Sequence, residues 1–87
     1  MKESEVRAQV RDLLRWKGWF VYYLLQGLGS YPGLSDMVAV KAGRVIHIEL
    51  KTKRGKQSDN QIQFQADIEA AGGEYRVVRC IEDVSDL

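Results

Sequence analysis

The amino-acid sequence predicts a small α/β domain in which helices flank a mixed β-sheet. Residues 3 to 17 and 57 to 73 carry apolar side chains at helical spacing. The other apolar segments are short, rich in β-branched or aromatic residues, and bounded by glycine turns. The expected order is therefore helix, strand, strand, strand, helix, strand. Because 87 residues can build one hydrophobic core, we expect a single domain over residues 1 to 87.

The first predicted helix covers residues 3 to 17. Its apolar side chains recur at helical spacing: Val6, Val10, Leu13 and Leu14. Gly18 then provides a stop signal. Glu3 lies three residues before Val6 and so shares the inward face of the helix. This acid at the rim of the core is a candidate site residue.

Four segments predict strands. Residues 19 to 25, WFVYYLL, predict a buried strand that ends at a loop rich in glycine. We expect the aromatic side chains of this strand to lie in the core or in a subunit contact. Residues 36 to 41 and 44 to 51 predict the arms of a hairpin around Ala42-Gly43. Residues 74 to 81 predict the last strand, and EDVSDL then predicts a short helix or a tail.

The second predicted helix covers residues 57 to 73. Ser58 suits the N-cap, and Gln61 occupies the third helical position, as in a capping box. Gly72-Gly73 closes the helix. Its inner side is expected to carry Ile62, Phe64 or Gln65, Ile68 and Ala71.

Composition narrows the classes of function. A net charge of +1 argues against a protein that holds nucleic acid by bulk charge alone, but basic side chains gather in residues 51 to 56, KTKRGK. No run approaches the roughly 20 apolar residues of a membrane span, so no membrane association is expected. The single cysteine, Cys80, gives no disulfide framework, which predicts a cytoplasmic protein. We expect Cys80 to be buried in its apolar segment.

Two acids and a lysine meet where the predicted hairpin arms end. Glu49 and Lys51 share one face of their strand, because successive side chains alternate between faces. If Ala42-Gly43 is a two-residue turn, Asp36 lies opposite Glu49, whereas a three-residue loop would separate the two acids. Facing carboxylates repel each other unless a cation intervenes. Mg²⁺ is commonly held by one or two carboxylates, with waters and phosphate completing its shell.

The spacing alone leaves two interpretations open. Asp36 could simply end a loop, and Glu49 with Lys51 could form an exposed ion pair worth under about 1 kcal/mol. A metal site is favoured by the combination of two acids, a lysine, a glycine turn before the first acid and a basic segment after the lysine.

The sequence resembles the PD-(D/E)xK nuclease superfamily and, more narrowly, the VRR-NUC (virus-type replication-repair nuclease) domain family in its stand-alone form. The matching positions span nearly the whole chain: Glu3, Gly33 to Asp36, Glu49 to Lys51, Ser58 to Gln61, Gly72-Gly73, and Tyr75 to Arg79. Ser35 departs from the pattern, because a proline often precedes the aspartate in this family. The resemblance implies a restriction-endonuclease-like fold.

The resemblance also implies roles for individual residues. Asp36 and Glu49 would be metal ligands for Mg²⁺ or Mn²⁺, with the backbone carbonyl of Leu50 as a further ligand. Lys51 would orient or activate the attacking water, and Glu3 would complete the site, also as a candidate ligand. For Gln61 two interpretations stay open: a capping-box partner of the helix, or a catalytic residue that faces the substrate or orients the lysine.

The implied activity is that of a metal-dependent, structure-selective DNA endonuclease that acts in DNA repair or recombination. Small phage and bacterial members of the family resemble Holliday junction resolvases, so four-way junctions and a homodimer are expected, in a bacterial or phage-infected cell. Lys53, Arg54 and Lys56 would contact DNA phosphates. The alternatives are a nucleic-acid-binding module of the same fold that does not cleave usefully on its own, and a structural domain whose stability does not respond to metal.

Overall fold

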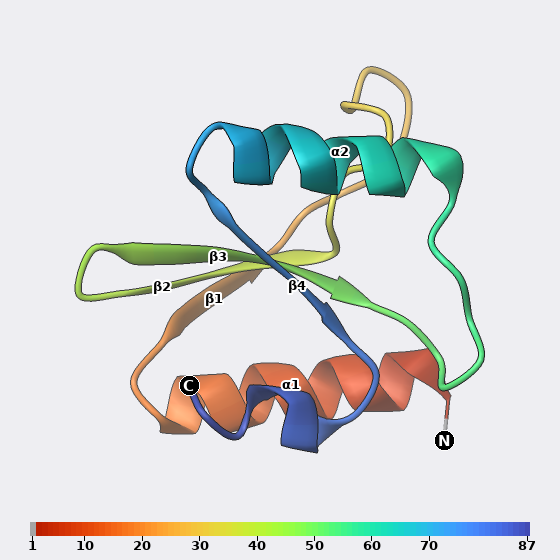
Figure 1. Cartoon of the computed structure of the whole chain (residues 1–87). Helices are drawn as coiled ribbons and strands as arrows, with labels where there is room; N and C mark the ends of the chain where they lie inside the picture. Colours follow the sequence, from red (N-terminus) through yellow and green to blue (C-terminus); the bar gives the residue numbers. More distant parts are fainter. Residues whose placement is uncertain (1) are drawn as a thin grey trace.

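The computed structural model describes residues 2–87 and shows a four-stranded sheet between two helices (Figure 1). The predicted order is confirmed. The elements are α1 (Glu3–Trp16), β1 (Phe20–Tyr23), β2 (Met37–Lys41), β3 (Arg44–Leu50), α2 (Asp59–Ala70), β4 (Glu74–Val78) and the 3-10 helix η1 (Ile81–Val84). Neither helix in residues 2–87 has the length and apolar character needed to cross a membrane.

The sheet is mixed, as predicted, and its strands lie in chain order. β1, β2 and β3 pair antiparallel, whereas β3 and β4 run parallel and are joined through α2. A parallel pair requires a crossover connection, which explains why a helix must lie between β3 and β4 in the sequence. The crossover brings the ends of β3 and β4 side by side, with Leu50 paired to Val78.

The main core lies between α1 and the sheet. Val6, Val10 and Leu14 form the buried face of α1. They pack with Trp19, which precedes β1, and with buried side chains of the sheet and η1: Val21, Met37, Ala39, Ile46, Ile48, Leu50, Val78 and Val84. On the opposite face of the sheet, α2 lies over β4 (Figure 1). The alternating side chains of β3 therefore divide between the core and the layer beneath α2.

β1 is an edge strand, and the prediction of a fully buried strand over residues 19 to 25 was wrong. Val21 points into the core and is 2% exposed, whereas Phe20 on the other face is 66% exposed. The reason is that α2 covers the β4 side of the outer face and leaves the β1 side open (Figure 1). Composition alone does not distinguish a strand buried on both faces from an apolar edge strand.

The last strand ends earlier than predicted. β4 stops at Val78, and the backbone N–H of Arg79 donates to Oδ2 of Asp83 at 2.8 Å. This contact turns the chain into η1, which confirms a short terminal helix. The expectation that Cys80 is buried was wrong, because this residue precedes η1 and is exposed.

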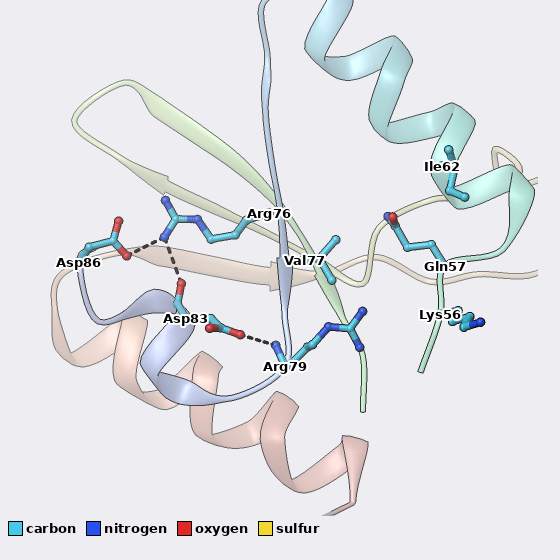
Figure 2. A pocket seen from close by; sticks show the side chains of 8 residues that line it. All are labelled: Lys56, Gln57, Ile62, Arg76, Val77, Arg79, Asp83 and Asp86. Carbon is cyan, nitrogen blue, oxygen red and sulfur yellow. Dashed lines mark hydrogen bonds and ion pairs between the residues drawn. The ribbon is translucent and has the colours of Figure 1, made fainter. Parts of the chain in front are cut away.

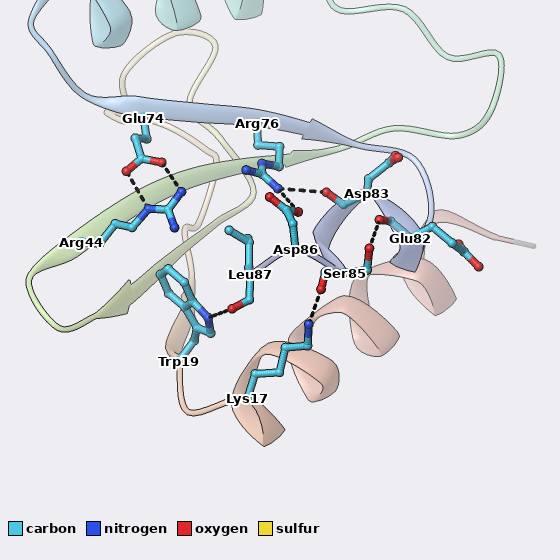
Figure 3. A network of polar contacts seen from close by, with 10 residues as sticks. All are labelled: Lys17, Trp19, Arg44, Glu74, Arg76, Glu82, Asp83, Ser85, Asp86 and Leu87. Carbon is cyan, nitrogen blue, oxygen red and sulfur yellow. Dashed lines mark hydrogen bonds and ion pairs between the residues drawn. The ribbon is translucent and has the colours of Figure 1, made fainter.

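Polar contacts fasten the C-terminal segment to the rest of the domain (Figure 3). Nη1 of Arg76 donates to Oδ1 of Asp86 at 2.7 Å and to the backbone carbonyl of Asp83 at 3.1 Å. Nζ of Lys17 donates to the carbonyl of Ser85 at 2.6 Å. The segment after β4 is thus held to both the sheet and the end of α1.

α2 is capped as predicted, but its inner face differs in two positions, because Ile62 and the C-cap residue Ala71 are both exposed. Phe64 is the buried residue of the helix, with Ile68 half-buried one turn further on. Ile62 was expected inside and is 53% exposed. The helix begins at Asp59 rather than at residue 57. In its first turn the side chain of Gln61, and not that of Ile62, points toward the sheet, where it contacts Glu49.

Candidate functional site

The hairpin has the register of a two-residue turn, which is the register that was predicted to bring Asp36 and Glu49 together. Lys41 pairs with Arg44, and Met37 pairs with Ile48. The two turn residues, Ala42-Gly43, have φ values of 51° and 81°. Positive φ at both central positions is typical of a two-residue type I′ turn. The three-residue alternative is therefore excluded.

Asp36 lies one residue beyond the paired ladder. Its backbone N–H donates to the carbonyl of Ile48 at 3.0 Å, although Met37 is the residue that pairs with Ile48. This offset by one place is the arrangement of a β-bulge, which redirects a side chain at the end of a strand. The Asp36 carboxylate turns toward the end of β3, where Oδ2 accepts the backbone N–H of Leu50 at 2.7 Å.

Glu49 is a buried acid beside Asp36. Its side chain extends from β3 on the face beneath α2, and the residue is only 1% exposed. Burial first, and then the hydrogen bond and charge of the neighbouring Asp36 carboxyl, raise the pKa of Glu49 to about 9, although the positive charge of Lys51 acts in the opposite direction. Without a cation, Glu49 therefore keeps a proton at neutral pH and lies against Asp36 as a carboxylic acid.

Gln61 is the capping-box partner of α2, and its side chain also contacts the acidic pair. Its Oε1 accepts the backbone N–H of Ser58 at 2.9 Å, and its own backbone N–H donates to the Ser58 hydroxyl at 3.2 Å, which completes the capping box. The other end of the same amide faces the acids, where Nε2 donates to Oε2 of Glu49 at 2.6 Å. One side chain thus couples the start of α2 to the acidic pair.

Gly33 allows α2 to approach the site. It has φ +79°, and a β-carbon at this position would overlap the backbone carbonyl of Asn60 and come within 2.8 Å of the backbone nitrogen of Gln61. The loop before Asp36 therefore packs directly on the first turn of α2. This contact explains why a glycine stands three residues before the acid: it fixes Gln61 relative to Asp36 and Glu49.

Lys51 and Glu3 lie around the acidic pair. The backbone N–H of Lys51 donates to the carbonyl of Val78 at 3.0 Å, so the parallel strand β4 holds the start of the basic segment. Lys51 lowers the pKa of Glu49, and Glu3 at the start of α1 raises it. Both charges therefore act on the buried acid, as expected if these residues belong to one site.

The donor set at this site fits a hard cation. Among residues 2–87, His, Cys, Asp and Glu form no group of three or more that could hold a metal ion, so Glu3 does not join the acidic pair in such a group. Asp36 and Glu49 would be the side-chain ligands, and the carbonyl of Leu50 remains a predicted ligand. Mg²⁺ needs only one or two carboxylates when waters and phosphate supply its other ligands. A divalent cation would also offset the repulsion between two ionised acids.

The predicted phosphate contacts lie on an exposed segment that follows the site. Lys53, Arg54 and Lys56 are exposed, and no ion pair within residues 2–87 involves them. Sequence reasoning placed Arg79 in a matching motif but missed its contact with this segment, in which its Nη1 donates to the carbonyls of Thr52 and Gly55. Contacts between a side chain and distant backbone carbonyls leave no pattern in the sequence.

Aromatic packing fills the layer between the sheet and α2. His47 contacts Phe64 edge to face, with ring centroids 6.0 Å apart, and its Nδ1 lies 3.3 Å from the carbonyl of Glu74. Tyr75 packs against Phe64 from β4. Burial, and then the charge of Glu49, raise the pKa of the Tyr75 phenol. Tyr75 therefore lies near enough to the buried acid for its phenol to respond to the charge of Glu49.

Comparison with known proteins agrees with this architecture. No protein-family model and no curated protein matches the chain. A solved structure described as a VRR_NUC domain superposes with a TM-score of 0.84 over 98% of this chain and 91% of that one, at 21% sequence identity. Such a likeness establishes the fold. The chain therefore has the fold of a VRR_NUC domain, as the resemblance in its sequence predicts.

Proposed function

We propose that this chain is a metal-dependent nuclease of the VRR-NUC family that hydrolyses phosphodiester bonds of DNA. The observation that carries the proposal is the buried Glu49 held against Asp36, with Lys51 close enough to act on its charge. A structural domain does not need an acid whose pKa is raised to about 9 by burial and by a second acid. Strongly perturbed acids of this kind are typical of functional sites.

In this proposal Asp36 and Glu49 hold Mg²⁺ or Mn²⁺. A divalent cation held there would supply Lewis-acid stabilisation of the phosphoryl group and would lower the pKa of a bound water. Glu49 must lose its proton to become a ligand, and Gln61 keeps its carboxylate oriented through the 2.6 Å hydrogen bond. Lys51 orients the attacking water and balances negative charge. Glu3 contributes a further acid at the rim of the site.

The proposed substrate is branched DNA, with four-way junctions favoured. Lys53, Arg54 and Lys56 supply phosphate contacts, which confer affinity without sequence information. Selectivity would then depend on the shape of the DNA. Two active sites on paired strands require a homodimer. Exposed apolar side chains such as Phe20 and Trp16, the latter 84% exposed, support a subunit contact.

The first test combines metal binding with cleavage. Mg²⁺ or Mn²⁺ should raise the melting temperature of the wild-type protein, and Glu49→Ala should abolish this rise. Labelled four-way junction, flap and duplex DNA are then incubated with each metal and with chelator. Paired, symmetric cuts in the junction would support the dimeric resolvase. Junction binding without cutting under either metal would instead identify a binding module, and no metal effect would refute the metal site.

A further inference from the structure

The basic segment between β3 and α2, residues 51 to 56, is held by Arg79, which directly follows β4. Nη1 of Arg79 donates to the backbone carbonyl of Gly55 at 2.6 Å and to that of Thr52 at 2.7 Å, and it lies 3.4 Å from that of Lys53. Three carbonyls from a segment without regular structure thus converge on one guanidinium nitrogen. The same segment carries the cations that would meet DNA.

The turn that Arg79 holds is compact. The backbone N–H of Gly55 donates to the carbonyl of Thr52 at 3.1 Å, so the two carbonyls contacted most closely by Arg79 lie at the two ends of one turn. A β-carbon on Gly55 would come within 2.8 Å of the Thr52 hydroxyl oxygen. The guanidinium of Arg79 therefore joins the two ends of a closely packed turn.

Arg79 is itself fixed in place. It directly follows Val78, whose carbonyl accepts the backbone N–H of Lys51, and its own backbone N–H donates to Asp83 (Figure 2). Its side chain lines a surface hollow together with Lys56 (Figure 2). The end of β4 thus anchors the basic segment both at its first residue and at its turn.

We propose that Arg79 is a positioning residue: it holds the turn over residues 52 to 55 so that Lys53, Arg54 and Lys56 face the DNA phosphates as a fixed set. This inference rests on the proposed function for the identity of the ligand. It differs from an ordinary phosphate contact, because the Nη1 donor of Arg79 is already committed to backbone carbonyls. Its effect on DNA binding would pass through cations other than its own.

Arg76 provides a matched control. It lies three residues earlier, within β4, and its Nη1 donates to Asp86 and to the carbonyl of Asp83 rather than to the basic segment (Figure 3). Arg79→Gln and Arg76→Gln therefore remove the same charge from neighbouring positions. Only Arg79→Gln should remove the hydrogen bonds that hold the turn over residues 52 to 55.

The first readout is the salt dependence of binding to an uncut four-way junction in the presence of chelator. Loss of one direct phosphate contact lowers the slope of log K against log salt by about 0.9. We expect Arg79→Gln to lower it by about 2 or more, because several cations lose their fixed arrangement, and Arg76→Gln to lower it by less than about 1. A decrease of about 0.9 or less for Arg79→Gln, or equal decreases for the two variants, would overturn the proposal.

The second readout needs no DNA and separates this inference from the proposed function. Amide exchange at Gly55, measured by NMR on the free protein, should accelerate about tenfold or more in Arg79→Gln and stay unchanged in Arg76→Gln. Unchanged Gly55 exchange in Arg79→Gln would show that the turn does not depend on Arg79 and would overturn the proposal. If the wild-type protein failed to bind the junction, the proposed role of the basic segment in DNA binding would be refuted. The rate of amide exchange at Gly55 would still decide whether Arg79 holds the turn.

Discussion

Substitution of Gly33 by alanine tests how the loop before Asp36 builds the site. The new β-carbon would overlap the Asn60 carbonyl and press on the Gln61 nitrogen at 2.8 Å. Both are backbone atoms of the first turn of α2, so no side-chain rotation can relieve the overlap. The loop and the helix would have to separate, and this movement would pull Gln61 away from Glu49.

The expected loss of stability has two parts. An alanine at φ +79° costs about 1 to 2 kcal/mol relative to glycine because of its left-handed conformation. Forced displacement of packed backbone adds about 1 to 3 kcal/mol. The expected total of about 3 kcal/mol is a large fraction of the roughly 4 to 13 kcal/mol that stabilises a domain of this size.

Gly29→Ala is the matched control, because Gly29 lies in the same loop at φ +87° and, among residues 2–87, no atom would lie within 4 Å of the new β-carbon. It should lose only the conformational part, about 1 to 2 kcal/mol. Urea denaturation followed by circular dichroism gives both values. Equal losses for the two variants would refute a role for close packing between the loop and α2.

Two further predictions concern the buried polar groups of the site. The pKa of Glu49 is about 9 in the folded protein, above its ordinary value of 4.5. Between pH 4.5 and about 9 the folded, metal-free protein therefore holds one more proton than the unfolded chain. Its free energy of unfolding should fall by about 1.4 kcal/mol for each pH unit across this range. Urea unfolding in chelator at pH 6 and 8 should show this slope in the wild type but not in Glu49→Gln, and parallel slopes would contradict the shift. The buried Ser35 hydroxyl has no hydrogen-bond partner within residues 2–87, so Ser35→Ala should stabilise the protein by about 1 kcal/mol. Ser85→Ala, which removes a hydroxyl that donates to the Glu82 carbonyl at 2.8 Å, should not, and equal shifts in melting temperature would reject this explanation.

Local patterns in the sequence were sufficient for the hairpin and for the start of α2. Ala42-Gly43 marked the position of the turn and left a two-residue and a three-residue loop open; the two-residue turn in the structure determines the register that brings Asp36 to the end of β3. The capping box followed from the spacing of Ser58 and Gln61. Both features depend on residues only a few positions apart, which is why local reasoning succeeds.

Features that depend on distant segments could not be predicted in the same way. The exposure of Phe20 follows from which half of the sheet α2 covers, and the position of Asp36 follows from a bulge at the end of the ladder. The second contact of Gln61, with Glu49, requires the crossover to bring α2 back over β3. Arg79 was missed as a structural contact because its partners are backbone carbonyls, which every residue possesses.

The most direct test of the central claim is cleavage of a labelled four-way junction with Mg²⁺ or Mn²⁺ by the wild type, by Lys51→Ala and by Lys41→Ala. Lys41 is a matched control, because it lies at the turn end of the same hairpin, where its Nζ donates to the carbonyl of Lys17. The account predicts metal-dependent cutting that Lys51→Ala abolishes and Lys41→Ala retains. Cutting that persists in chelator, or that Lys51→Ala leaves intact, would contradict it.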